Sequence, residues 1–476
     1  MRYNVRFISS YPERVCGIAT YCRDLATALS HCSEVDSIRI AAIDEDYRQI
    51  LGNPERFTTT PYFLPVDMTI DKNNKDSCIA AAGEIITRAA RSDYHTVNVF
   101  MHEFGLLGRD DYQNIVRILK ASDKLTNIVN MHTVLRNPNE EQRAIVREIS
   151  DLTECTIVPT EAAVDILTSD VYGLSREKVR QIKHGIRVHE YSQLDRDETR
   201  LRLGIRNLIP IVNIGLRSPT KGTRFIVESY GKFIEDASLS DELREMLCLF
   251  IFGDYHPKIP QEVKKADEDE IREVIKNYGL KSTTVREFPK IGKAAKKYDV
   301  VFYQKPLTEA ELRDSYTIGE ICVIGNREPQ QISSGILSDA AGFGKVIVST
   351  KNKHSLELLC PLELREQLGL VGKIQNSSGL LVDIEGDEKI PSVEQYVEAF
   401  KYLLIEDNPD NNPKANLRRA IGEKAREIAH EMRWEYIGRI WSENISSILD
   451  LKFAPKSTPV ILEESADTQA REDKKE

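Results

Sequence analysis

The sequence has no uninterrupted apolar run of the roughly 20 residues that a membrane-spanning helix requires. Residues 1–11 form a polar start and a strand-like run, without the apolar segment of a signal peptide. No two of the eight cysteines are spaced as Cys-x-x-Cys, which argues against a zinc cluster and predicts free thiols in a reducing compartment. We therefore predict a cytoplasmic protein without a transmembrane segment.

The sequence also has no excess of basic residues over acidic ones. The 65 Lys and Arg stand against 75 Asp and Glu, which gives a formal net charge of −10. Proteins that bind nucleic acids generally carry a basic surface, so no nucleic-acid partner is expected, although a local cationic pocket for a small anion is compatible with this charge. The first strand is not followed by the G-x-G-x-x-G turn of dinucleotide-dependent dehydrogenases, and no Walker A phosphate loop occurs.

Short apolar runs alternate with amphipathic helical stretches along most of the chain. A run such as LCLFIF, at residues 247–252, is typical of a strand buried on both faces of a parallel sheet. Strands that alternate with helices predict βαβ units, and hence an α/β fold. The predicted strands are residues 3–9, 97–101, 127–131, 156–158, 179–182, 209–214, 247–252, 321–324, 345–349 and 379–382. The predicted helices are residues 17–29, 111–120, 140–150, 161–168, 222–234, 260–278, 334–342, 392–406 and 416–451.

The strand series breaks at a polar segment, residues 187–206, and restarts at residue 209. We interpret the segment as a linker, with a short helix at residues 197–203, between two Rossmann-like, doubly wound parallel-sheet domains that face a central cleft. The last helical stretch is too long to serve the second domain alone, so its end is expected to cross back to the first. The predicted divisions are 1–200 (first domain), 201–430 (second domain), 431–455 (returning helix) and 456–476 (disordered tail).

Polar residues follow predicted strands of the first domain, and ligands of open parallel sheets bind at the carboxyl ends of strands. Gly17 lies between a strand and a helix, where it would admit a phosphate or sugar to the backbone, or would only serve a tight turn. His102 and Glu103 follow a second strand and His132 follows a third, so these side chains are expected in one crevice. No third ligand stands at metal spacing, so no metal site is predicted.

Two segments of the second domain contain groups that could bind an anion. Arg217 and Lys221 leave a strand and lead into a helix, an arrangement that suits a diphosphate but could equally be a solvated basic turn.

The second of these segments begins a helix with Ser333, Ser334 and Gly335, whose first amides would be free for an anion. Asp339 lies one turn into the same helix. It could accept hydrogen bonds from a ribose diol, or could be a solvated carboxylate.

Taken in order, the segments SSYPERVCGIATY, MHEFG, NMHTVLRNP, IGLRSPTKG and Q-x-SSG resemble those of retaining glycosyltransferases of the GT-B fold, family four (group 1). Within that family the sequence resembles a subgroup with HEFG, HTVL and Q-x-SSG motifs, and the resemblance spans residues 3–450. It implies transfer of a sugar from a nucleotide-diphosphate sugar, UDP- or GDP-linked, to a carbohydrate or lipid-linked acceptor. It also implies that no metal or other cofactor is needed, and that the leaving phosphate accepts the acceptor's proton.

Site residues are implied by the same resemblance. The implied catalytic residues are His132, Lys221 and Arg217; the donor-binding residues are Gly17, Glu328, Gln331, Ser333, Ser334, Gly335 and Asp339; the residues of the cleft or acceptor site are His102, Glu103 and His184.

The sequence departs from the family's E-x7-E motif. Gln331, an amide, stands at the first acidic position and Asp339 at the second, while Glu328 lies three residues before Gln331 and could substitute for it. Arg217 stands one place later than the usual Gly-Arg pair. These departures leave the identity of the donor sugar open.

Two alternatives remain from the sequence. One is a glycoside phosphorylase or sugar epimerase on the same fold, and the other is a catalytically silent protein that binds a sugar or nucleotide, which the amide at Gln331 favours. The acceptor and the oligomeric state stay open, and a peripheral membrane contact is compatible with the absence of a spanning segment.

Overall fold

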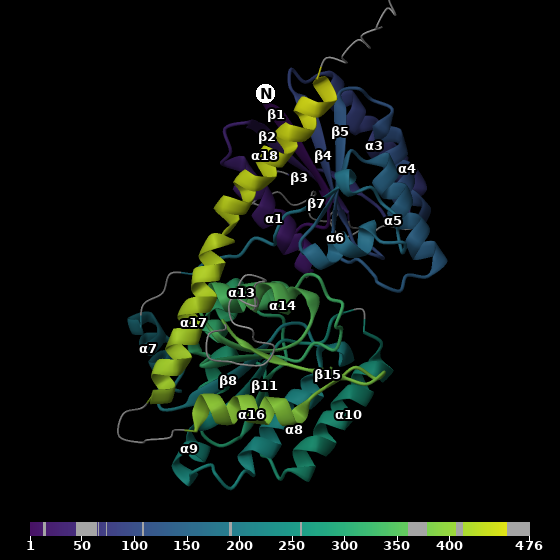
Figure 1. Cartoon of the computed structure of the whole chain (residues 1–476). Coiled ribbons are helices and arrows are strands. Elements are labelled where there is room, and N and C mark those ends of the chain that lie inside the picture. The colour runs from purple at the N-terminus through teal and green to yellow at the C-terminus, as the bar shows by residue number, and fades with distance from the viewer. Residues whose placement is uncertain are drawn as a thin grey trace, which may run out of the picture.

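The computed structural model describes residues 1–12, 16–43, 64, 66–72, 74–106, 109–189, 193–257, 259–359, 378–405 and 413–454. These residues form two α/β domains, each built on a parallel sheet of seven strands with helices against both faces (Figure 1). The predicted fold class is confirmed by this architecture.

The first sheet has the strand order β3-β2-β1-β4-β5-β6-β7. The order of strands reverses between β1 and β4, which opens a crevice at their carboxyl ends. The strands are β1 Tyr3–Ser9, β2 Val35–Ile43, β3 Val66–Ile70, β4 His95–His102, β5 Leu125–Met131, β6 Cys155–Val158 and β7 Val179–Gln181. The helices are α1 Gly17–Ser30, α3 Lys75–Ala90, α4 Arg109–Lys120, α5 Glu140–Leu152, α6 Glu161–Thr168 and the short turn η2 Arg176–Lys178.

The second sheet repeats this plan with the order β10-β11-β9-β8-β12-β13-β14, and its reversal lies between β8 and β12. The strands are β8 Ile209–Ile214, β9 Leu247–Phe252, β10 Ser282–Val285, β11 Val300–Tyr303, β12 Ile321–Ile324, β13 Val346–Thr350 and β14 Leu380–Val382, with a separate hairpin of β15 Ile384–Glu385 and β16 Ile390–Pro391. The helices and helical turns are α7 Gln193–Arg202, η3 Pro219–Lys221, α8 Thr223–Ile234, α9 Asp241–Met246, α10 Gln261–Asn277, η4 Phe288–Lys290, α11 Ile291–Ala295, α12 Glu309–Ile318, α13 Gly335–Gly342, α14 Lys353–Leu359 and α16 Val393–Leu404.

The last helical segment is two helices, α17 Pro413–Glu431 and α18 Trp434–Phe453. The sequence predicted a single stretch, and the break falls where Ile186 inserts its backbone: its N–H donates to Met432 O (2.8 Å) and its carbonyl accepts from Trp434 N (3.3 Å). α17 packs on the second domain beside α13, and α18 runs along the first domain against α1 (Figure 1). Trp441, fully buried, joins the core formed by α1 and the first sheet.

Ten predicted strands are present with shifts of at most two residues at an end, because most of them are buried apolar runs; β7, which is VRQ and only partly buried, is an exception. β2, β3, β10 and β11 were not predicted from their patterns. β10 is only partly buried and polar (STTV), and so lacks the apolar signal of its neighbours. The linker helix α7 begins earlier than predicted, at Gln193. The predicted disordered tail, 456–476, lies outside the described residues.

Within the described part of the chain, we find no helix that is both long and apolar enough to cross a membrane.

Candidate functional site

A cavity of ≈ 710 Å³ lies between the two domains, at the carboxyl ends of both sheets. Loops after β1, β4 and β5 form its first-domain wall, and loops after β8 and β12 form its second-domain wall. Nine of the predicted site residues line this cavity: Gly17, Glu103, His132, His184, Lys221, Glu328, Gln331, Ser333 and Gly335. The sequence thus identified segments that are far apart in the chain and that share one cavity in the fold.

Lys221 ends the short turn η3 and lies in the second-domain wall. The turn is fixed by Gly222, whose φ of 65° is in the left-handed region, and by a hydrogen bond from Arg327 N to Thr220 O (2.8 Å). Burial lowers the pKa of the Lys221 ammonium. No ion pair or hydrogen bond to this ammonium occurs within the described residues, so an anion in the cavity would supply the missing counter-charge.

Helix α13 begins at Gly335, in the second-domain wall, so its first turn opens on the same cavity as Lys221. Ser334 caps the helix through its side chain, which accepts from Leu337 N (3.4 Å). The partial positive charge at a helix N-terminus adds to that of the ammonium. A diphosphate is the kind of group that suits both.

Gln331 and Glu328 lie on the loop that joins β12 to α13. The Asn326 side-chain amide donates to Gln331 Oε1, and Glu328 is paired with Lys389 at 2.5 Å. Asn326, in turn, is held through its carbonyl by Thr350 Oγ1 (2.6 Å). Both side chains on this loop are therefore fixed by partners that also line the cavity or lie directly behind it.

Three histidines and Tyr21 form a row of rings that crosses from one domain to the other. The Tyr21 ring centre lies 4.7 Å from that of His132 and 4.9 Å from that of His184, and His184 lies 6.1 Å from His354 of the second domain. Burial lowers the pKa of His132 to about 3, that of His184 to about 4 and that of His354 to about 3. All three rings are therefore neutral at pH 7, and they can donate and accept hydrogen bonds without adding charge.

Glu103 is the carboxylate of the first-domain wall. It accepts a hydrogen bond from Thr133 Oγ1 (2.6 Å) and one from Phe104 N (3.0 Å). Burial raises its pKa above the ordinary value. The group is thus positioned to accept hydrogen bonds from a hydroxyl-bearing ligand.

Arg217 does not line this cavity, contrary to its expected place beside Lys221. It is 3% exposed, and its Nη2 donates to Tyr255 Oη (2.8 Å), which donates to Asp267 Oδ2 (2.5 Å) on α10. Successive side chains of extended backbone point to opposite sides, so a shift of one place relative to the family's Gly-Arg pair turns the guanidinium away from the cleft. Arg217 braces α10 against the sheet instead.

Asp339 also lies outside the interdomain cavity. It lines a separate pocket of ≈ 420 Å³ with Arg187, His189 and Glu309. Burial raises the pKa of Asp339 to about 6, and the charge of Arg187 opposes this shift. The helical repeat accounts for the placement, because Asp339 lies four positions after Gly335 and is therefore about one turn further along the helix from the cavity.

The other two predicted residues lie beside the cavity rather than in its wall. His102 is buried behind Phe104, and burial lowers its pKa to about 4. The Ser334 backbone N–H is used within the protein, donating to His354 Nδ1 (2.9 Å).

His354 was not predicted from the sequence. It lies four residues after the end of β13, in α14. The expectation that polar residues after strands line the cleft singled out His102 and His132, and it would also have singled out His354 if α14 had been predicted. Because its Nδ1 accepts the Ser334 N–H, the neutral ring carries its proton on Nε2, a buried donor without a partner among the residues described here.

The two domains also meet through charged groups outside the cavity. Asp24 of α1 accepts from Arg187 Nε (2.6 Å), and the neighbouring Arg23 pairs with Glu309 of α12 (2.6 Å). On another side, Glu357 of α14 accepts from the backbone N–H groups of Glu161 and Ala162 at the start of α6 (3.2 and 3.1 Å). These contacts connect elements that the cavity separates.

No protein-family model matches the sequence, and no curated protein sequence matches it either. Solved structures do resemble the whole chain. HepE of Anabaena, in complex with UDP, superimposes with a TM-score of 0.62 and 13% identity over 94% of this chain and 100% of that one. An α,α-trehalose-phosphate synthase (UDP-forming) from Burkholderia xenovorans, in complex with glucose-6-phosphate, gives a TM-score of 0.60 and 10% identity over 94% and 100%. At such identities the similarity establishes the two-domain fold.

Proposed function

We propose that this protein is a retaining glycosyltransferase that moves a sugar from a nucleotide-diphosphate sugar to an acceptor hydroxyl. The proposal depends on one observation above all: the desolvated ammonium of Lys221, which has no partner among the described residues, and the start of α13 line a cavity whose opposite wall carries His132. A ligand with an anionic and a sugar-like end would satisfy both walls.

The proposed roles of these groups follow from where charge develops during sugar transfer. Cleavage of the bond between the sugar and the diphosphate places negative charge on the leaving group, and Lys221 with the amides at the start of α13 would stabilise it. A single fixed donor of this kind is worth about 3–4 kcal/mol at a transition state. In this proposal, protein cations and amides meet the charge and no metal is required.

The sugar would lie toward the first domain. His132, neutral at pH 7, would hydrogen-bond a sugar hydroxyl, and Gln331 would orient another with its amide. For a retaining reaction the acceptor would attack from the face that the diphosphate leaves, and a phosphate oxygen would take its proton. Contact between the domains would exclude the water that would otherwise hydrolyse the donor.

UDP-glucose is the first donor to test, because structures of Anabaena HepE are described with UDP and with UDP-glucose. Glucose and glucose-6-phosphate are the first acceptors, since they accompany structures of similar fold. Sugars linked to GDP form the second group, and a lipid-linked acceptor remains within the proposal.

The decisive experiment combines binding and turnover. A thermal-shift screen with UDP, GDP and ADP should show stabilisation by one of them, since only a ligand of the folded state raises Tm. Incubation with the matching nucleotide sugar should then release nucleoside diphosphate and yield a product that keeps the donor's anomeric configuration by NMR. Nucleotide binding without turnover on any acceptor would favour the silent binding protein, and activity only with a sugar 1-phosphate would favour the phosphorylase.

A further inference from the structure

A second large cavity, of ≈ 1040 Å³, lies in the second domain at the edge opposite the cleft. It is bounded by α7, by α17 and by the residues that precede β8, β12 and β13. The cleft lies at the carboxyl ends of these strands and this cavity at their amino ends. The second cavity is therefore separate from the proposed active site.

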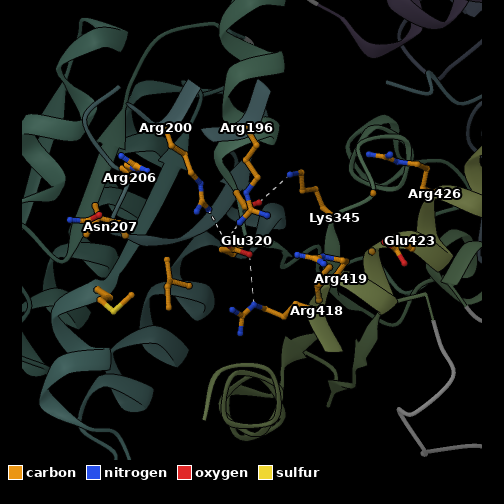
Figure 2. A pocket seen from close by; sticks show the side chains of 17 residues that line it. Arg196, Arg200, Arg206, Asn207, Glu320, Lys345, Arg418, Arg419, Glu423 and Arg426 are labelled. Atoms are coloured by element: carbon orange, nitrogen blue, oxygen red, sulfur yellow. Dashed lines mark hydrogen bonds and ion pairs between the residues drawn. The ribbon is translucent and has the colours of Figure 1, made fainter. Parts of the chain in front are cut away.

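The lining of this cavity is strongly cationic (Figure 2). Six arginines and one lysine face two carboxylates, Glu320 and Glu423, which is a formal excess of five positive charges; burial and the neighbouring arginines lower the pKa of Lys345. The whole chain carries a net charge of −10, so a positive cavity of this size is opposite in sign to the molecule. Neighbouring like charges repel each other, and a bound counter-charge would lower this cost.

The floor of the cavity is built of cations that the fold itself uses. Arg200, 7% exposed, donates to Ile318 O (2.6 Å) and pairs with Glu320 (3.0 Å). Lys345, 3% exposed, donates to Thr317 O and Gly319 O (3.2 Å each). Arg196 and Arg418 share the same Glu320. One carboxylate thus serves three guanidinium groups.

The arginines at the rim of the cavity differ from the cations of its floor in exposure and in pairing. Arg206, just after α7, and Arg419, on α17, are both exposed, and neither has an ion pair or hydrogen bond in the described part of the chain. Figure 2 shows them on opposite sides of the cavity, with the Glu320 cluster between them. Arg206 and Arg419 thus add two exposed cations on either side of the charged floor of the cavity.

We infer that this cavity binds a small phosphorylated anion that carries at least two negative charges. Guanidinium groups match phosphoryl oxygens in geometry and bind them through paired hydrogen bonds. The buried floor favours a small molecule that enters the cavity over a flat anionic lipid surface, which would contact the rim alone.

The test uses the full-length chain with inorganic pyrophosphate as the probe. Isothermal titration is performed on a Lys221→Ala protein, so that binding of pyrophosphate in the cleft is weakened, and the two multiple variants share whatever binding remains there. Adding Arg206→Ala and Arg419→Ala should weaken pyrophosphate binding about tenfold or more, as the loss of two charge-assisted contacts implies. Adding Arg286→Ala and Lys293→Ala instead, which removes the same charge from exposed positions outside the cavity, should change the affinity less than twofold.

Equal affinities in the two multiple variants would overturn the inference, and so would the absence of pyrophosphate binding by the Lys221→Ala protein. Binding of phosphatidylcholine–phosphatidylserine vesicles that depends on Arg206 and Arg419, without binding of pyrophosphate, would also overturn it in favour of a membrane contact. The four substituted side chains are exposed, and unchanged melting temperatures would verify that each variant is folded.

Discussion

Two lysines of the second domain have buried ammonium groups. They differ in which groups surround the ammonium in place of water. The ammonium of Lys345 donates to two backbone carbonyls and holds the end of α12, whereas that of Lys221 faces the interdomain cavity without a partner among the described residues. A desolvated charge that the fold does not satisfy is costly, and this cost is the reason for proposing that Lys221 binds an anion. This contrast separates Lys345, whose role is structural, from Lys221, which we propose binds the ligand.

Lys221→Ala should therefore reduce turnover by about 10²-fold or more, the usual effect of removing one donor to a developing oxyanion. The variant should remain folded, since its ammonium makes no contact that supports the described structure. Steady-state kinetics with the donor found in the screen would measure the effect, with Lys293→Ala as an exposed control. A loss smaller than threefold would remove Lys221 from the mechanism.

The buried carboxyl group of Asp339 should make the folding stability depend on pH. Its pKa is raised to about 6 in the folded chain from an ordinary 3.8, so the folded state holds a proton that the unfolded state has lost between about pH 4 and 6. Folding stability from this group is thus greatest below pH 4 and declines as pH rises through 6. Asp339→Asn removes this term. The Tm of the variant relative to the natural protein should rise between pH 4.5 and 7, and a constant difference would contradict the raised pKa.

Much of the candidate site could be predicted at this scale, because the ends of buried strands are visible in the sequence. Gly17, His132 and Lys221 were found in this way. The position of a side chain depends on the local backbone, which is extended at Arg217 and helical at Asp339, and on neighbours distant in the sequence, which is why both lie elsewhere than expected. A motif that matches the family's with a shift of one residue, as at Arg217, does not show on which side of the backbone the side chain lies.

Among the elements, the turn η3 shows how backbone geometry places a side chain. Gly222 has a φ of 65°, and a Cβ built on it would lie 2.0 Å from Gly325 O. The turn and the loop after β12 approach each other so closely that only glycine fits. The position of Lys221 therefore depends on a neighbour that carries no functional group.

Gly222→Ala should displace η3 and weaken nucleotide binding, besides costing about 1–3 kcal/mol in backbone strain. Gly204→Ala is the matched control, because Gly204 has a similar φ of 72° but no atom within 4 Å of the added carbon. Calorimetric titration with the nucleoside diphosphate would compare the two. Equal affinities would show that η3 tolerates the clash and that the turn does not position Lys221.

Prediction of strands succeeded for most of the uniformly buried apolar runs, although β11, which is also buried throughout, was missed. β9 and β12 are continuous apolar runs buried throughout, and both were predicted with their observed bounds. The division of the last helix could not be foreseen from its composition, because the break is stabilised by the backbone of Ile186, about 250 residues earlier in the chain. Long-range contacts of this kind leave no local pattern.

For the molecule as a whole, α18 ties the end of the chain to the first domain. Trp441→Ala should lower the melting temperature of that domain by roughly 10 °C, since truncating a buried aromatic side chain costs about 3–5 kcal/mol. Tyr436→Ala, on the same helix but 46% exposed, should change it little. Differential scanning calorimetry would measure both, and similar melting temperatures for the two variants would show that α18 does not stabilise the first domain.

The hydrogen bonds of Ile186 with Met432 and Trp434 have a consequence for the chain's topology. The polypeptide leaves the first domain and re-enters it at the same point, so the second domain is an insertion whose two ends are held side by side. Removal or replacement of this module would therefore leave the two points at which it joins its host next to each other.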